Sequence, residues 1–223
     1  MKLAYFIIYL GTIVIFIAFI FSLLPTKKHK PSYYNYITFF ILGGLFLSVN
    51  AIYSINITVR LTKAGFLIQQ SIIFLQFIFL VLFFLKILEG FFKTKVIKIF
   101  IYLSIFTEFI LLVTSTIENK GIYANTMSNL FLLFLSFFYF KDLLQNKPKL
   151  LLTKSSPFWI VIGIFIFSCV SFPIYALYPA IPISKNNSNL RLQIFSIINI
   201  SLIIMYLFFI KSYLCLKHPQ NLQ

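Results

Sequence analysis

The chain has 223 residues, of which 61% are hydrophobic and 30 are Phe, and its mean hydropathy is +0.98. Soluble globular domains are about 45–50% apolar, so this composition excludes an ordinary soluble protein. The formal net charge is +15 at pH 7. Basic residues beside membrane-spanning helices set topology and attract anionic headgroups, which accounts for the charge without nucleic acid. We therefore expect a lipid bilayer around the chain and no nucleic-acid partner.

Seven apolar stretches are long enough for membrane-spanning helices, each of which needs roughly 20 mainly apolar residues. In chain order they are Leu3–Leu24, Tyr36–Ile57, Phe66–Leu88, Val96–Thr116, Ile122–Phe140, Phe158–Tyr178 and Leu192–Leu214. The fifth is the weakest prediction, because Asn125, Ser128 and Asn129 lie in its first half. Without it, six helices remain. The sequence predicts an all-α polytopic membrane protein, with residues 1–223 forming a single seven-helix transmembrane domain and no soluble domain.

The distribution of Lys and Arg over the connections predicts the orientation. The positive-inside rule counts these residues in short loops and near helix ends. Of the 19 basic residues, 13 lie on the side reached after the first, third, fifth and seventh stretches, and 6 lie on the other side with the N-terminus. We therefore expect the N-terminus outside and the C-terminus in the cytoplasm.

Residues that carry catalysis or bind metal ions are scarce. The chain has only four acidic residues and two histidines. His29 and His218 both lie beside lysines, away from any carboxylate pair or Cys cluster, so the spacing of a metal site is missing. Glu89 follows Lys86 by three residues, which predicts a structural ion pair on one helical face. We expect no enzyme, no metal ion and no cofactor.

Glu108 is the strongest functional residue that the sequence offers. It lies near the middle of the fourth stretch, where an ionised carboxylate is costly and usually faces a cavity or a partner group. The third helix runs in the opposite direction, which places Gln76 at nearly the same depth and would allow a hydrogen bond between the two side chains. The alternative is that Glu108 only joins two helices through a hydrogen bond, as polar residues often do in membranes.

Polar side chains gather in the expected outer halves of the second to seventh helices, whereas the inner halves hold apolar runs such as Phe77–Leu85 and Ile160–Phe167. Polar groups inside a bilayer must be satisfied by one another or by water. The asymmetry predicts a receptor-like pocket that opens to the outer face and is closed by apolar residues below it. Its predicted ligand-binding residues are Glu108, Gln76, Gln69, Asn50, Asn129 and Asn199. The alternative is that these side chains only cross-link helices.

The longest expected cytoplasmic connection is Lys141–Pro157, which contains both basic and acidic side chains. We interpret it as a docking surface for a partner, with Lys141, Asp142, Lys147 and Lys149 as the contact residues. The alternative is a solvated loop whose lysines only satisfy the positive-inside rule.

Two segments near the C-terminus carry a resemblance to a known family. One is Ser156–Gly163, with the sequence SPFWIVIG, and the other combines Ile197–Ile200 with Met205–Phe208 in the last helix. These segments resemble uncharacterised small seven-helix membrane proteins of Bacteroidetes, which are similar to the membrane portions of sensor kinases without the kinase. The resemblance implies a bacterial cytoplasmic (inner) membrane, a role in signalling and a correspondence between Glu108 and a glutamate that is common in the family.

Three functional hypotheses follow. The leading one is a sensory or signalling accessory protein that binds a small or lipidic ligand in its outer half and acts through a histidine kinase or another membrane signalling partner. The first alternative is a small-solute or proton-coupled transporter that uses Glu108. The second is a structural subunit of a membrane complex, for which the charge of Glu108 would matter little.

Overall fold

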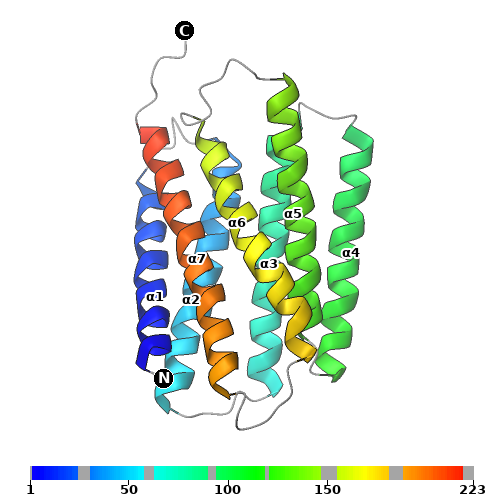
Figure 1. Cartoon of the computed structure of the whole chain (residues 1–223). Helices are drawn as coiled ribbons and strands as arrows, with labels where there is room; N and C mark the ends of the chain where they lie inside the picture. The colour runs from blue at the N-terminus through cyan, green and yellow to red at the C-terminus, as the bar shows by residue number, and fades with distance from the viewer. Residues whose placement is uncertain are drawn as a thin grey trace.

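The computed structural model describes residues 2–24, 31–57, 63–89, 94–118, 121–146, 155–180 and 188–217, and the described residues contain helices and no strand. The seven α-helices run side by side along one direction (Figure 1). Their bounds are α1 Lys2–Leu23, α2 Tyr34–Ile57, α3 Lys63–Ile87, α4 Thr94–Glu118, α5 Gly121–Asn146, α6 Ser156–Leu177 and α7 Ser188–Lys217, and a short 3-10 helix, η2, covers Tyr178–Ala180. The all-α prediction is confirmed.

The largest difference at a single helix end is at the C-terminus of α5. This helix was expected to end at Phe140 but continues to Asn146, and α6 begins at Ser156, two residues early. The drop in hydropathy at Lys141 marks the end of the apolar stretch and not the end of the helix. Leu143 follows Tyr139 by one turn, and both side chains are buried, so packing continues along the same face. The predicted connection Lys141–Pro157 is therefore shorter than expected, and its first residues belong to α5.

The helices alternate in direction, so that α1 starts at the bottom of Figure 1 and α7 ends at the top. Each helix packs against the next one in the chain, and α1 packs against α7, which closes the arrangement. Helix α4 packs on α3 and α5 and lies at one side of the bundle (Figure 1). Short connections between antiparallel neighbours produce this order without any crossing segment.

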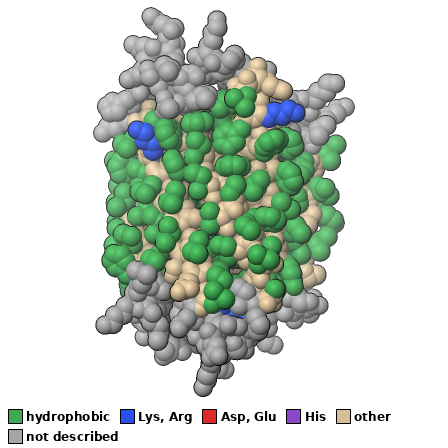
Figure 2. Space-filling view, in the orientation of Figure 1, with side chains coloured by type: hydrophobic (Ala, Val, Ile, Leu, Met, Phe, Trp, Pro, Cys, Tyr) green, Lys and Arg blue, Asp and Glu red, His purple; other side chains and the backbone are tan. Residues whose placement is uncertain are grey.

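Six of these helices, α1, α2, α3, α5, α6 and α7, are long and apolar enough to cross a membrane. The stretch predicted least securely, at Ile122–Phe140, is among them. Figure 2 shows hydrophobic side chains over the middle of the visible face, with Lys or Arg side chains near the upper edge of this apolar area. A bundle that is apolar on its outside suits a bilayer, because lipid tails and not water surround the helices. The protein is therefore an integral membrane protein by the character of its helices.

The apolar core is concentrated at one end of the bundle. We call this end the upper half; it comprises the C-terminal halves of α1, α3, α5 and α7 and the N-terminal halves of α2, α4 and α6. Its buried side chains include Ile41, Phe84, Leu135, Ile164 and Phe209. Among the described residues of the opposite, lower half, the buried apolar side chains are Ile7, Ala124, Ile198 and, close to the middle of α5, Leu132. Tight apolar packing thus closes the upper half only.

Candidate functional site

Glu108 lies on the inward stripe of α4. Ile101, Ser104 and Glu108 follow one another at helical spacing and are all buried, and Glu108 is only 3% exposed. Phe106 and Phe109, on either side of it in the sequence, are more than half exposed. The helix therefore turns its apolar side chains outward and its carboxyl inward, as expected for a helix surrounded by lipid.

The Glu108 carboxyl meets α5, where it forms a side-chain hydrogen bond with Ser128. Its Oε1 atom is buried and has no hydrogen-bond partner among the described residues. A buried polar atom without a hydrogen-bond partner costs about 1–3 kcal/mol. Native proteins therefore contain few such atoms, and those that remain often have a functional role. Within the described ranges, the Glu108 carboxyl thus has one side-chain partner and one oxygen without a hydrogen-bond partner.

A second polar contact lies directly beside the first, because Asn129 follows Ser128 on α5. Ser171 Oγ on α6 donates to Asn129 Oδ1 at 2.7 Å, and Asn129 Nδ2 donates to the Asn125 carbonyl at 2.6 Å. Ser168, one turn from Ser171 on α6, is fully buried, and its Oγ has no partner in the part of the chain that the structure describes. Polar side chains of three helices therefore form one layer, which we call the carboxyl layer. It comprises Glu108 of α4, Ser128 and Asn129 of α5, and Ser168 and Ser171 of α6.

Gln76 does not belong to this layer. Its Nε2 donates to the Phe40 carbonyl of α2 at 2.9 Å, and no hydrogen bond between Gln76 and Glu108 is found among the described side chains. Gly43 on α2 allows the approach, since a Cβ added there would lie 2.9 Å from Gln76 Cγ. The sequence predicted the depth of both residues but not the rotation of the two helices, which turns Gln76 toward α2 and Glu108 toward α5.

The other predicted ligand residues are distributed over the bundle. Gln69 and Asn50 are half-buried, while Gln70, which was not among the predicted residues, is buried at 7% exposure. Asn199 Nδ2 donates to the Phe195 carbonyl of its own helix at 2.8 Å. Of the six predicted residues, Glu108 and Asn129 are therefore the two that the carboxyl layer brings together.

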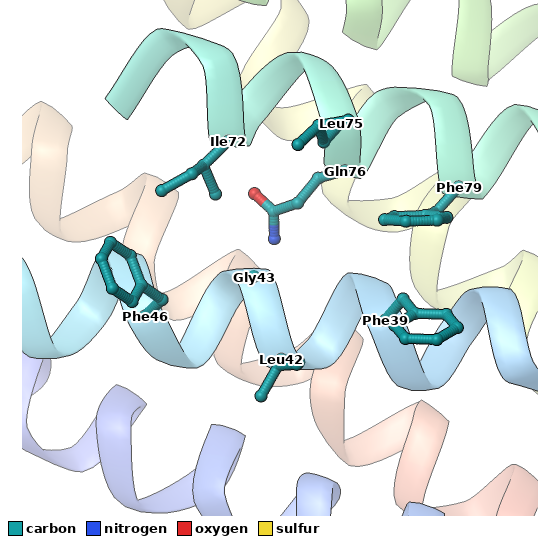
Figure 3. Close-up of a pocket in the computed structure, with 8 residues that line it drawn as sticks. All are labelled: Phe39, Leu42, Gly43, Phe46, Ile72, Leu75, Gln76 and Phe79. Atoms are coloured by element: carbon teal, nitrogen blue, oxygen red, sulfur yellow. The ribbon is translucent and has the colours of Figure 1, made fainter. Parts of the chain in front are cut away.

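An open groove of about 310 Å³ runs between α2 and α3, with Gln76 and Gly43 in its wall (Figure 3). Its other lining residues are apolar and comprise Phe39, Leu42, Phe46, Ile72, Leu75 and Phe79. The rings of Phe39 and Phe79 stack with their centroids 5.3 Å apart. The sequence analysis missed this groove, because its residues are ordinary membrane-helix residues and only the packing of α2 on α3 brings them together.

The predicted docking surface changes with the longer α5. Lys141 is exposed on that helix, but Asp142 is only 2% exposed and its side chain faces the interior. Lys147 and Lys149 lie outside the described residues. Asp142 was expected on the surface because the sequence pattern ended the helix before it, whereas the helical turn rotates it toward the bundle.

A hydrogen-bonded cluster in the upper half was also missed. Tyr34 of α2 contacts the hydroxyl groups of both Ser156 on α6 and Ser212 on α7, the latter with the two oxygens 2.8 Å apart. Ser156 Oγ donates to the Ser212 carbonyl at 2.7 Å, and Ser212 Oγ donates to the Ser156 carbonyl at 2.8 Å. Single serines in apolar helices usually bond their own backbone, so the sequence carries no signal of this three-helix contact.

The predicted ion pair between Lys86 and Glu89 is confirmed, with Nζ and Oε2 3.1 Å apart. Comparison of the chain with protein-family models, with curated proteins and with solved structures gives no match. The family resemblance of the C-terminal segments therefore stays a prediction.

Proposed function

We propose that α4 is a seventh membrane span. Its 25 residues extend about 37 Å at 1.5 Å per residue, more than the ~30 Å of a bilayer hydrocarbon core. Large apolar side chains cover its exposed face, namely Ile99, Tyr102, Leu103, Phe106, Phe109, Ile110 and Val113. A helix that turns a carboxyl inward and these groups outward is stable in lipid and poorly soluble in water. Seven spans place the two termini on opposite sides of the membrane.

The upper end is the cytoplasmic end in this proposal. Lys86, Lys98, Lys141 and Lys211 all lie there and are exposed, as the positive-inside rule requires. The Lys211 ammonium lies 5.9 Å from the centroid of the Trp159 ring, an arrangement suited to the membrane–water interface, where Trp is enriched. The N-terminus is then outside, and the carboxyl layer lies in the outer half of the bundle.

The protein is, in this proposal, a membrane-embedded sensory or signalling accessory protein that binds a small or lipidic ligand at the carboxyl layer. The observation that carries the proposal is the buried Oε1 of Glu108, which has no hydrogen-bond partner in the described part of the chain. A ligand with a hydrogen-bond donor would satisfy this oxygen. The upper half is closed by its apolar core, so such a ligand has no polar route onward. The site therefore suits recognition of a ligand better than conduction of a solute.

In this proposal, a partner protein receives the signal. A ligand that prefers one arrangement of the helices shifts the population toward it. Ser171 belongs to the carboxyl layer and Ser156 to the upper cluster, and both lie on α6. This helix thus connects the proposed ligand site with the proposed cytoplasmic end. A histidine kinase or another membrane signalling protein would contact the exposed side chains there, including Lys141.

Thermal unfolding in vesicles tests the ligand part of the proposal. The purified protein is heated with fractions of a polar and lipid extract of the source cells, beside Glu108→Gln and the matched control Glu89→Gln, whose carboxylate is exposed. A ligand at 100 times its Kd stabilises by about 2.7 kcal/mol. We expect one fraction to raise Tm in the unchanged and Glu89→Gln proteins but not in Glu108→Gln. The absence of any fraction that distinguishes the two variants would contradict the proposal.

The alternative function is proton-coupled transport of a small solute. The same free carboxylate oxygen favours it, because a proton carrier needs an ionisable group inside the membrane. Solute or proton flux into proteoliposomes that is lost in Glu108→Gln and kept in Glu89→Gln would replace the sensory proposal with this one.

A further inference from the structure

The α2–α3 groove is a second site, separate from the carboxyl layer, and we propose that it binds a hydrocarbon chain carrying one hydroxyl group, or an equivalent donor, part-way along its length. Its occupant is a membrane amphiphile, held by the apolar groove walls and by a hydrogen bond from its donor to Gln76 Oε1. This inference goes beyond the proposed function, because it concerns another helix pair and does not require Glu108.

The groove faces the surroundings of the bundle. Phe39, Leu42, Phe46 and Leu75 are all about half exposed, although they line it. Both helices belong to those that are long and apolar enough to cross a membrane, so lipid has direct access to the groove. A volume of about 310 Å³ lies at the lower end of the ~300–1,000 Å³ of small-molecule pockets, which are mainly apolar with a few placed polar groups.

Gln76 supplies the placed polar group. Its Nε2 donates a hydrogen bond to the Phe40 carbonyl at 2.9 Å. Figure 3 shows this nitrogen directed toward Gly43 and the amide oxygen directed toward the side of Ile72. Oε1 has no hydrogen-bond donor among the described residues, and lipid hydrocarbon offers none. An unmet acceptor in an apolar groove selects a chain that brings a donor to this depth.

The depth of Gln76 sets where the donor must lie on the chain. The residue is eleven positions from the end of α3 at Ile87, about 16 Å along the helix. Half of a ~30 Å hydrocarbon core is about 15 Å, so Gln76 lies near the bilayer centre. A headgroup anchored at the interface does not reach it. A hydroxyl group in the second half of a long acyl chain does.

Photolabelling in vesicles of phosphatidylethanolamine and phosphatidylglycerol tests the proposal. Diazirine-labelled stearate is competed with 12-hydroxystearate or with stearate, which has the same length and no hydroxyl. We expect label in the peptides that hold Phe39–Phe46 and Ile72–Phe79. We also expect 12-hydroxystearate to compete at about a fivefold lower concentration than stearate, the effect of one net hydrogen bond. Equal competition by the two acids, or label spread evenly over the exposed helices, would overturn the proposal.

Variants assign the effect to the groove. Ile72→Trp fills it, whereas Ile68→Trp places the same ring one turn away on an exposed position outside its lining. We expect loss of label only in Ile72→Trp, and loss of the preference for the hydroxylated acid in Gln76→Met. A preference that survives in Gln76→Met would overturn the role of Gln76. Glu108→Gln should label normally, which separates this test from that of the proposed function.

Discussion

Replacing Glu108 with Leu separates a ligand site from a structural joint between helices. The substitution removes the hydrogen bond with Ser128, and such interhelical bonds in membranes are worth about 0.6 kcal/mol on average. It also removes the buried Oε1, which has no partner among the residues that the structure describes, and an unsatisfied buried atom of this kind costs about 1–3 kcal/mol. The second effect is larger. We therefore expect Glu108→Leu to raise the free energy of unfolding by about 1 kcal/mol while abolishing ligand-induced stabilisation.

Unfolding in mixed micelles by sodium dodecyl sulfate measures this change, with circular dichroism and the fluorescence of Trp159, the only Trp of the chain, as two probes. Ser171→Ala is the control, because it removes an interhelical hydrogen bond whose donor, Ser171 Oγ, and acceptor, Asn129 Oδ1, satisfy each other in the unchanged protein. This substitution should lower the free energy of unfolding by about 0.6–1.7 kcal/mol. A loss of more than about 1 kcal/mol in Glu108→Leu would refute the reasoning. It would show that the carboxyl is a joint between α4 and α5 and not an open acceptor.

Three further predictions concern the rest of the bundle. Tyr34→Phe removes the hydroxyl group that contacts two serines in the upper cluster, and it should lower the free energy of unfolding by about 1–3 kcal/mol in the same assay, whereas an unchanged value would show that the serines satisfy each other. Gly43→Ala brings a methyl group 2.9 Å from the side chain opposite, so it should destabilise by about 1–2 kcal/mol, while Gly11→Ala, with its nearest contact at 3.6 Å, should be neutral or slightly stabilising. Lys2→Cys and Lys217→Cys, each in a chain freed of its two cysteines, should react with an impermeant maleimide on opposite sides of the membrane, and reaction on the same side would mean that only six helices span.

Much of the fold follows from hydropathy alone, and the exceptions are instructive. All seven stretches form helices, including the one that contains Asn129. The end of α5 was missed because the signal read from the sequence is apolarity, which stops at Lys141, while the helix continues until its packing on the bundle stops. Glu108 was recognised because a carboxyl in an apolar stretch stands out. The Ser156 contacts were not, because a hydroxyl group in a helix end has many partners available to it.

The sequence by itself determined the class of the protein, the number and approximate bounds of its helices, and the residue with the most unusual environment. The reason is that a bilayer imposes the same demand on every segment, about 20 apolar residues with their backbone groups bonded within the helix. Only the tertiary structure decided which helix each polar side chain meets. Successive residues are turned by about 100° around a helix, so depth follows from counting residues, whereas the direction of Gln76 toward α2 and of Glu108 toward α5 depends on how whole helices rotate to pack.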